Sequence, residues 1–163
     1  MTRIGDDGAI TVTGINIQWP WSQLLLSGKK TVETRGYPLP EAYRGQWLAL
    51  IETPGPKGRQ SAGIHQARIQ GLIVFAESFL YRDRNHWLSD RDRHLVSTDD
   101  PLYSYQPGSE KWGWVVQGIL LFPGPLKAPL RKGIVFTRNC SIRLSPDDFI
   151  QSGAQRISFF DTV

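Results

Sequence analysis

Residues 18–35 read Gln-Trp-Pro-Trp-Ser-Gln-Leu-Leu-Leu-Ser-Gly-Lys-Lys-Thr-Val-Glu-Thr-Arg, and this stretch decides the fold. Its proline suits the first turn of a helix, and apolar residues at i, i+3 and i+4 from Trp21 give that helix one apolar stripe. Gly28 stands where a helix C-cap glycine belongs. The stretch therefore predicts a helix of about two turns over 20–27, followed at once by a strand over 30–35.

Three charged residues follow that glycine, namely Lys30, Glu33 and Arg35. In a regular strand Glu33 and Arg35 point to one face and Val32 to the other. Lys30 lies in the turn before the strand, where it can swing to the polar side. A Glu33–Arg35 pair could hold the guanidinium in position for a phosphate or a base edge. The alternative is an ordinary surface ion pair, which contributes little.

Short strands with alternating or continuous apolar residues recur along the rest of the chain. Residues 54–63, rich in Pro, Gly and basic residues, predict an exposed loop, and residues 84–97 fit either a helix or a charged excursion. The pattern predicts an α+β domain, a small and partly closed β-barrel of about six or seven strands with two or three short helices. The other predicted elements are strands over 9–18, 46–52, 67–80, 112–121 (stopped by Pro123-Gly124-Pro125), 133–143 and 156–160, and a helix over 145–153.

The length of 163 residues fits one domain. We expect a flexible N-terminal tail over 1–8, a barrel core over 9–130, and a C-terminal extension over 131–163 packed on the same domain. The sequence has no apolar run long enough to cross a membrane and no signal-peptide h-region. The single cysteine, Cys140, cannot form an internal disulfide and is typical of a small core residue, which indicates a cytoplasmic location.

A net charge of +4 favours an anionic partner such as nucleic acid. Trp112 and Trp114 have i, i+2 spacing, which would put both rings on one face of a strand. Such rings can form a stacking platform for bases or can simply pack in the core. Arg44 would extend a basic surface around them.

Several well-known motifs are absent from the sequence. A phosphate loop ending at Gly28-Lys29-Lys30-Thr31 would need a glycine where Gln23 stands, and there is no Gly-x-Ser-x-Gly elbow. The three histidines do not pair with cysteines or carboxylates at metal-ligand spacing. We therefore predict no metal and no cofactor.

The pattern Gly-x-Lys-x-x-Glu-x-Arg, formed by Gly28, Lys30, Glu33 and Arg35, resembles the signature of the ASCH domain family. The preceding Gln-Trp-Pro-Trp at 18–21 is similar to that family's Gln-Pro-Trp entry to the first helix, with one tryptophan inserted or substituted. The Arg-Gly pair at 44–45 and the Lys-Trp-Gly-Trp-Val run at 111–115 are similar to the openings of two family strands. The resemblance covers roughly residues 14–130. It implies a PUA-like pseudo-barrel with a cleft between barrel and helices, and RNA binding as the default role.

The same resemblance implies two enzymatic alternatives, since one branch of the family removes the acyl group from N4-acylated cytidine and another has been described as a ribonuclease. In the amidohydrolase branch a lysine at the Lys30 position acts with a threonine where this chain has Glu33, and with a further glutamate. The residues Glu77, Asp90 and Glu110 are candidates for that third group.

We therefore predict a protein that binds RNA or a nucleoside-like ligand in a basic, aromatic-lined cleft. The first alternative is a hydrolase of modified nucleosides or RNA with Lys30 and Glu33 as catalytic residues. The second is a protein-interaction domain with a vestigial cleft. The predicted ligand-binding residues are Trp21, Gly28, Lys30, Glu33, Arg35, Arg44, Trp112 and Trp114.

Overall fold

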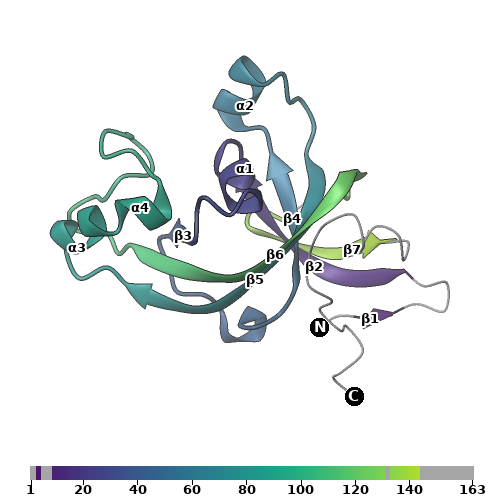
Figure 1. Ribbon diagram of the computed structural model, residues 1–163, viewed down its shortest axis with the longest axis horizontal. Helices are drawn as coiled ribbons and strands as arrows, with labels where there is room; N and C mark the ends of the chain where they lie inside the picture. The colour runs from purple at the N-terminus through teal and green to yellow at the C-terminus, as the bar shows by residue number, and fades with distance from the viewer. Residues whose placement is uncertain (1–2, 5–8, 131–132, 144–163) are drawn as a thin grey trace.

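A mixed sheet forms the body of the molecule (Figure 1). The computed structural model describes residues 3–4, 9–130 and 133–143. In these residues the sheet has seven strands: six follow the order β1-β2-β4-β5-β6-β3, and the seventh, β7, pairs with β2. The elements are β1 (Arg3–Ile4), β2 (Ile10–Gln18), α1 (Trp21–Leu26), β3 (Val32–Arg35), the 3₁₀ helix η1 (Glu41–Tyr43), β4 (Leu48–Thr53), α2 (Gly55–Ser61), β5 (Arg68–Leu80), α3 (Arg84–Ser89), α4 (Arg91–His94), β6 (Trp112–Lys127) and β7 (Phe136–Ile142).

The sheet is open, which corrects the predicted partly closed barrel. β2 pairs with β4 in parallel, and the other strand pairs are antiparallel. Among the described residues β3 pairs with β6 alone, and no backbone ladder joins it to β2. A side chain crosses this gap instead, because the Nη2 of Arg35 on β3 donates to the carbonyl oxygen of Asn16 on β2 at 3.0 Å. The α+β class is confirmed.

The predicted loop over 54–63 is wrong, since most of it forms α2. Glycine and proline disfavour helix, but a tertiary contact compensates here. A Cβ on Gly58 would lie 3.3 Å from Cβ of Trp19, so the missing side chain lets the helix pack tightly against this tryptophan. Residues 84–97, predicted as either a helix or a charged stretch, contain the short helices α3 and α4.

The predicted strand over 112–121 continues as β6 to Lys127, through both prolines. Leu121 pairs with Gly71 and Leu126 with Ile69, so four residues of β6 face one residue of β5. The prolines thus lie in a bulge where no ladder hydrogen bond requires their missing N–H. A bulge of this kind cannot be read from the spacing of apolar residues.

Both ends of the described chain join the sheet. Within the predicted tail, Arg3–Ile4 pairs with β2 as β1, and within the predicted extension β7 pairs with β2 along its length. The predicted helix over 145–153 and strand over 156–160 lie outside the described residues.

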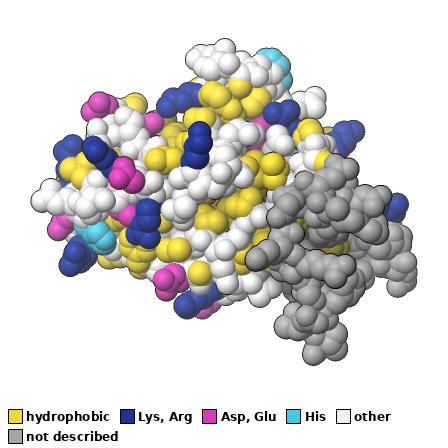
Figure 2. Space-filling model, viewed as in Figure 1, with side chains coloured by type: hydrophobic (Ala, Val, Ile, Leu, Met, Phe, Trp, Pro, Cys, Tyr) yellow, Lys and Arg dark blue, Asp and Glu magenta, His cyan; other side chains and the backbone are white. Residues whose placement is uncertain are grey.

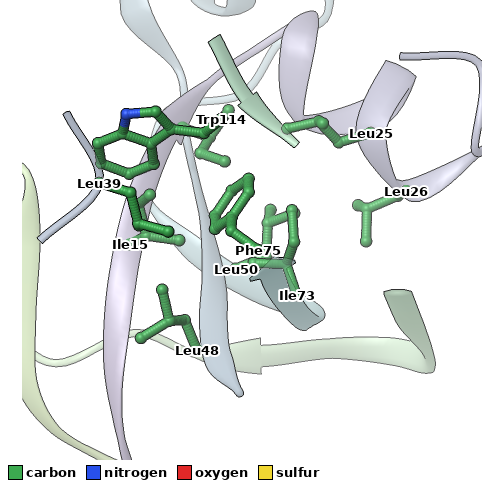
Figure 3. Packing of buried hydrophobic residues seen from close by; sticks show 10 residues of the cluster. Ile15, Leu25, Leu26, Leu39, Leu48, Leu50, Ile73, Phe75 and Trp114 are labelled. Carbon is green, nitrogen blue, oxygen red and sulfur yellow. The ribbon is translucent and has the colours of Figure 1, made fainter. Parts of the chain in front are cut away.

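Two clusters of apolar side chains hold the sheet together. Figure 3 shows part of the first cluster, in which Trp114 and Phe75 pack edge to face with ring centroids 5.5 Å apart. Leu25 of α1 is fully buried in the same cluster, which fixes the first helix to the sheet. The second cluster contains Cys140, which is buried, and burial raises the pKa of its thiol to about 11.

We expect Gly71→Ala to destabilise the fold by about 1–3 kcal/mol, because overpacking at a closed backbone contact forces the strands apart. A Cβ at this position would lie 2.2 Å from the backbone oxygen of Leu120 on β6. The matched control is Gly124→Ala in the bulge of β6, where an added Cβ meets nothing within 4 Å. Urea unfolding measures both variants, and equal stability of the two would contradict this account.

Candidate functional site

A cavity of about 680 Å³ lies beside the gap between β2 and β3. Its walls come from these two strands, from the start of α1, and from the chain between α4 and β6. The residues lining it include Asn16, Gln18, Trp21, Lys30, Glu33, Thr34, Arg35, Thr53, Leu102, Tyr103, Gln106, Glu110, Lys111 and Ile134.

The turn after α1 delivers Lys30 to the cavity. Gly28 adopts a φ of +75°, which an L side chain rarely takes, and the chain folds back so that the N–H of Lys30 donates to the carbonyl of Leu24 at 2.9 Å. The Lys30 side chain is 1% exposed, its Nζ donates to the carbonyl oxygen of His94, and it lies 3.5 Å from Oε2 of Glu33. The predicted swing of this lysine to the polar side is confirmed.

Glu33 stands between two cations. Its Oε1 lies 3.2 Å from Nη2 of Arg35, while Oε2 faces Lys30. The Arg35 guanidinium also lies over the Trp114 ring, 5.7 Å from its centroid, and its buried Nε has no hydrogen-bond partner in the described residues. An unsatisfied buried donor at a cavity wall is costly unless a ligand or water meets it.

The electrostatics of the cavity disfavour its ammonium groups. Burial lowers the pKa of Lys30, the neighbouring Glu33 opposes the shift, and the positive charges of Arg35 and Lys111 add to the lowering. Burial likewise lowers the pKa of Lys111, against the attraction of Asp100 and Glu33. A lysine with a lowered pKa is a better proton acceptor near neutral pH than a free lysine.

An aromatic pair forms another part of the wall. The rings of Trp21 and Tyr103 meet edge to face with centroids 4.7 Å apart, and the Tyr103 hydroxyl donates to Oε1 of Gln18 at 3.0 Å. Both rings are partly exposed to the cavity.

Of the eight predicted ligand-binding residues, the structure brings four to the cavity: Trp21, Lys30, Glu33 and Arg35. These residues are close in sequence, and the resemblance to the ASCH signature favoured a ligand site formed by the three charged ones over an ordinary surface ion pair. The four side chains line one cavity, as the resemblance implied.

The other four predicted residues lie elsewhere. Gly28 shapes the turn and is exposed, and Arg44 donates from Nε to the carbonyl of Ala76, away from the cavity. Trp114 is fully buried in the core and donates from Nε1 to the carbonyl of Tyr37, while Trp112 packs partly against the same core. Their i, i+2 spacing marks one face of β6, and that face is the core.

Sequence reasoning missed the wall contributed by the chain before β6. Tyr103 lies in a stretch without regular structure, far along the chain from the charged residues that it faces. Lys111 belongs to the Lys-Trp-Gly-Trp-Val run at 111–115, but nothing in that run predicts that its side chain lines a cavity. Its Nζ donates to the carbonyl of Tyr103 at 2.9 Å, which ties these two positions together.

Of the three candidates for a further catalytic carboxylate, Glu110 lines the cavity. Its Oε2 accepts a hydrogen bond from Nε1 of Trp112 at 2.9 Å. Asp90 instead accepts from the hydroxyl of Tyr81 at 2.5 Å within the α3–α4 region, and Glu77 is exposed on β5. The described residues contain no cluster of His, Cys, Asp or Glu suited to a metal ion, and none of their helices is long and apolar enough to cross a membrane.

Comparison with known proteins shows the fold. No family model and no curated protein matches the sequence. Solved structures do match: ASCH from Zymomonas mobilis superposes with a TM-score of 0.57 at 16% identity, covering 86% of this chain and 91% of that one. A serine-to-alanine variant of the same protein superposes with a TM-score of 0.56 at 15% identity, covering 85% of this chain and 92% of that one. A tyrosine-to-phenylalanine variant superposes with a TM-score of 0.57 at 15% identity, covering 85% of this chain and 94% of that one. The chain therefore has the fold of an ASCH protein, as the sequence motifs indicated.

Glu52 fixes the helix that carries Trp21. This carboxylate is fully buried at the end of β4, and α1 donates to it from Ser22 at 2.7 Å and from Gln23 at 2.6 Å. Arg68 also donates to it, at 3.1 Å. Burial raises the pKa of Glu52, but the hydrogen bonds together outweigh burial and hold the pKa below its ordinary value.

We expect Glu52→Gln to cost about 2–3 kcal/mol of stability at neutral pH, as for hydrogen bonds to a buried charge. Because the folded pKa is depressed, this contribution is present above the ordinary value near 4.5 and is lost as pH falls through the folded value. Wild type should therefore lose more stability than Glu52→Gln below about pH 4.5, measured by urea unfolding. Glu41→Gln removes an exposed carboxylate as the control, and parallel pH profiles of wild type and Glu52→Gln would contradict the assignment.

Proposed function

We propose that the cavity binds one nucleotide unit, either free or as part of an RNA strand. The observation that carries this proposal is the Lys30–Glu33–Arg35 network facing a cavity of about 680 Å³. Sites for single small ligands typically have volumes of about 300–1,000 Å³ and a few convergent polar groups. A wall that offers cations and a carboxylate side by side suits a ligand with both an anionic group and an amine.

Each part of the wall has a role in this proposal. Arg35 and Lys111 supply positive potential for a phosphate. Glu33, held between its two cations, accepts a hydrogen bond from an exocyclic amine of a base. Trp21 and Tyr103 present ring surface against which a base can pack. The fold shared with ASCH proteins supports the proposal through the RNA-binding role that the sequence resemblance implies.

The surface seen in Figure 2 favours a single bound unit over a long groove. Lysines and arginines are scattered over this face, with acidic side chains between them, and no continuous basic stripe is visible there. Non-specific binding of a long strand uses such a stripe. The cavity is therefore a better candidate for recognition than this face.

A second candidate function is hydrolysis of an N-acylated nucleoside, and the lowered pKa of the buried Lys30 favours it. In this reaction the neutral amine of Lys30 takes a proton from water as the water oxygen bonds to the acyl carbon. The proton passes to the exocyclic nitrogen as the C–N bond breaks, and the products are a carboxylic acid and the free amine. Arg35 would stabilise the developing oxyanion. Glu33, where the related amidohydrolases have threonine, distinguishes this site from theirs.

Arg35→Gln should weaken binding of a short single-stranded RNA and of nucleoside monophosphates at least tenfold, since it removes a charge-assisted contact at the cavity wall. The control is Arg44→Gln, which removes the same charge from a residue outside the cavity and should change affinity less than twofold. Fluorescence titration at two salt concentrations measures both variants. Equal loss in the two variants, or no binding by wild type, would refute the proposal.

For the hydrolytic alternative, wild type should release acid from a panel of N-acylated nucleosides, and Lys30→Met should abolish turnover while Arg44→Gln retains it. Thermal unfolding of each variant checks that the fold persists. The absence of turnover by wild type across the panel would leave binding as the function of the cavity.

A further inference from the structure

Residues 81–111, called here the excursion, form a separate unit between β5 and β6. The unit has a small core of its own, in which Tyr81, Trp87 and Val96 are buried. Tyr103 and Tyr105 pack against this core from the long stretch before β6. In Figure 1, α3 and α4 extend beyond the ends of β5 and β6, away from β2 and β7. The excursion supplies one whole wall of the cavity, including Tyr103 and Lys111.

The excursion is joined to the body by backbone on one side of the cavity. The N–H of Tyr81 donates to the carbonyl of Lys111 at 2.9 Å and closes its base. The N–H of Thr31, just before β3, donates to the carbonyl of Arg93 at 3.0 Å. The Lys30 ammonium adds a bond to the carbonyl of His94 beside it.

On the opposite side, the described contacts of the excursion with α1, α2 and β2 are made by side chains. Lys57 of α2 forms an ion pair of 3.4 Å with Asp100, and its side chain is 59% exposed. Tyr103 reaches Gln18 through its hydroxyl and Trp21 through its ring. An ion pair with an exposed member contributes little, so the Lys57–Asp100 pair can break at low cost.

The stretch between α4 and β6 has the features of a movable segment. It runs through residues 95–111 without helix or strand, and structureless stretches of this length are commonly lids or binding loops. Leu95 has a φ of +55° and Gly108 a φ of +82°, so a left-handed residue lies near each end. Hinges are commonly a few loop or element-terminal residues that absorb changes of φ and ψ. An added Cβ at Gly108 meets nothing within 4 Å, so this position is open.

We propose that residues 95–111 of the excursion form a lid on the cavity, hinged near Leu95 and Gly108 and latched to the body by Lys57–Asp100 and Tyr103–Gln18. This inference concerns the regulation of the site described under the proposed function and rests on it. Breaking the latch moves the wall that carries Tyr103 and admits a ligand. Closing it places the ligand between that wall and the Lys30–Glu33–Arg35 network.

Amide hydrogen exchange of the full chain tests the lid without any ligand, because exchange through local opening reports the free energy of that opening. Residues 97–107 should exchange faster than the amides of β5 and β6. Lys57→Gln should raise the exchange rates of residues 97–107 about two- to fivefold, in line with the loss of an exposed ion pair. Tyr103→Phe should raise them about two- to tenfold.

The matched control is Arg59→Gln, which removes the same charge from an exposed position of the same helix. It should leave residues 97–107 unchanged. In wild type, added salt should speed exchange of residues 97–107 by screening Lys57–Asp100, and Lys57→Gln should lack this response.

Equal effects of Lys57→Gln and Arg59→Gln would overturn the latch. Exchange of residues 97–107 only together with β5 and β6 would overturn the lid. Either result is independent of the binding titrations, so the lid and the proposed function can fail separately. If a nucleoside monophosphate binds, slower exchange of residues 97–107 in its presence supports closure over the ligand, and unchanged exchange overturns it.

Discussion

The structure depends on one carboxylate that forms ion pairs with two cations beside the open gap between β3 and β2. Glu33 faces Lys30 on one side and Arg35 on the other, and Arg35 then reaches the β2 carbonyl of Asn16. A closed barrel would join β3 and β2 through backbone hydrogen bonds; here the Arg35 side chain makes a hydrogen bond across the gap. Because no ladder joins β3 and β2, there is room for a cavity beside the gap. The charged side chains of Lys30, Glu33 and Arg35 line it.

This arrangement puts a lysine where lysines are rarely found. An ammonium group that is 1% exposed costs free energy unless other groups compensate for the lost hydration. The carboxylate of Glu33 and the carbonyl of His94 provide that compensation, and the latter belongs to the excursion. The same lysine thus contacts both Glu33 in the cavity wall and His94 in the excursion.

The sequence predicted what is local and failed on what is distant. The helix over 20–27, the glycine turn and the strand over 30–35 follow from spacing and turn chemistry, whereas the choice of a ligand site over a surface ion pair needed the resemblance to the ASCH signature. Trp112 and Trp114 were placed on a ligand face because periodicity reveals that two residues share a face and does not reveal which face is covered. Helix α2, the bulge in β6 and the wall around Tyr103 rest on contacts between segments far apart in the chain, which single-sequence patterns do not contain.

The two ends of the excursion meet at the hydrogen bond between Tyr81 and Lys111, which lie just beyond the paired ends of β5 and β6. Because its entry and exit are neighbours, its length and composition can change without altering the register of the strands behind it. During evolution such an insert can be replaced while β3, with Glu33 and Arg35, stays the same. Among proteins of this architecture, we expect the sequence differences that change ligand specificity to lie mainly in that insert, and the sheet to vary less.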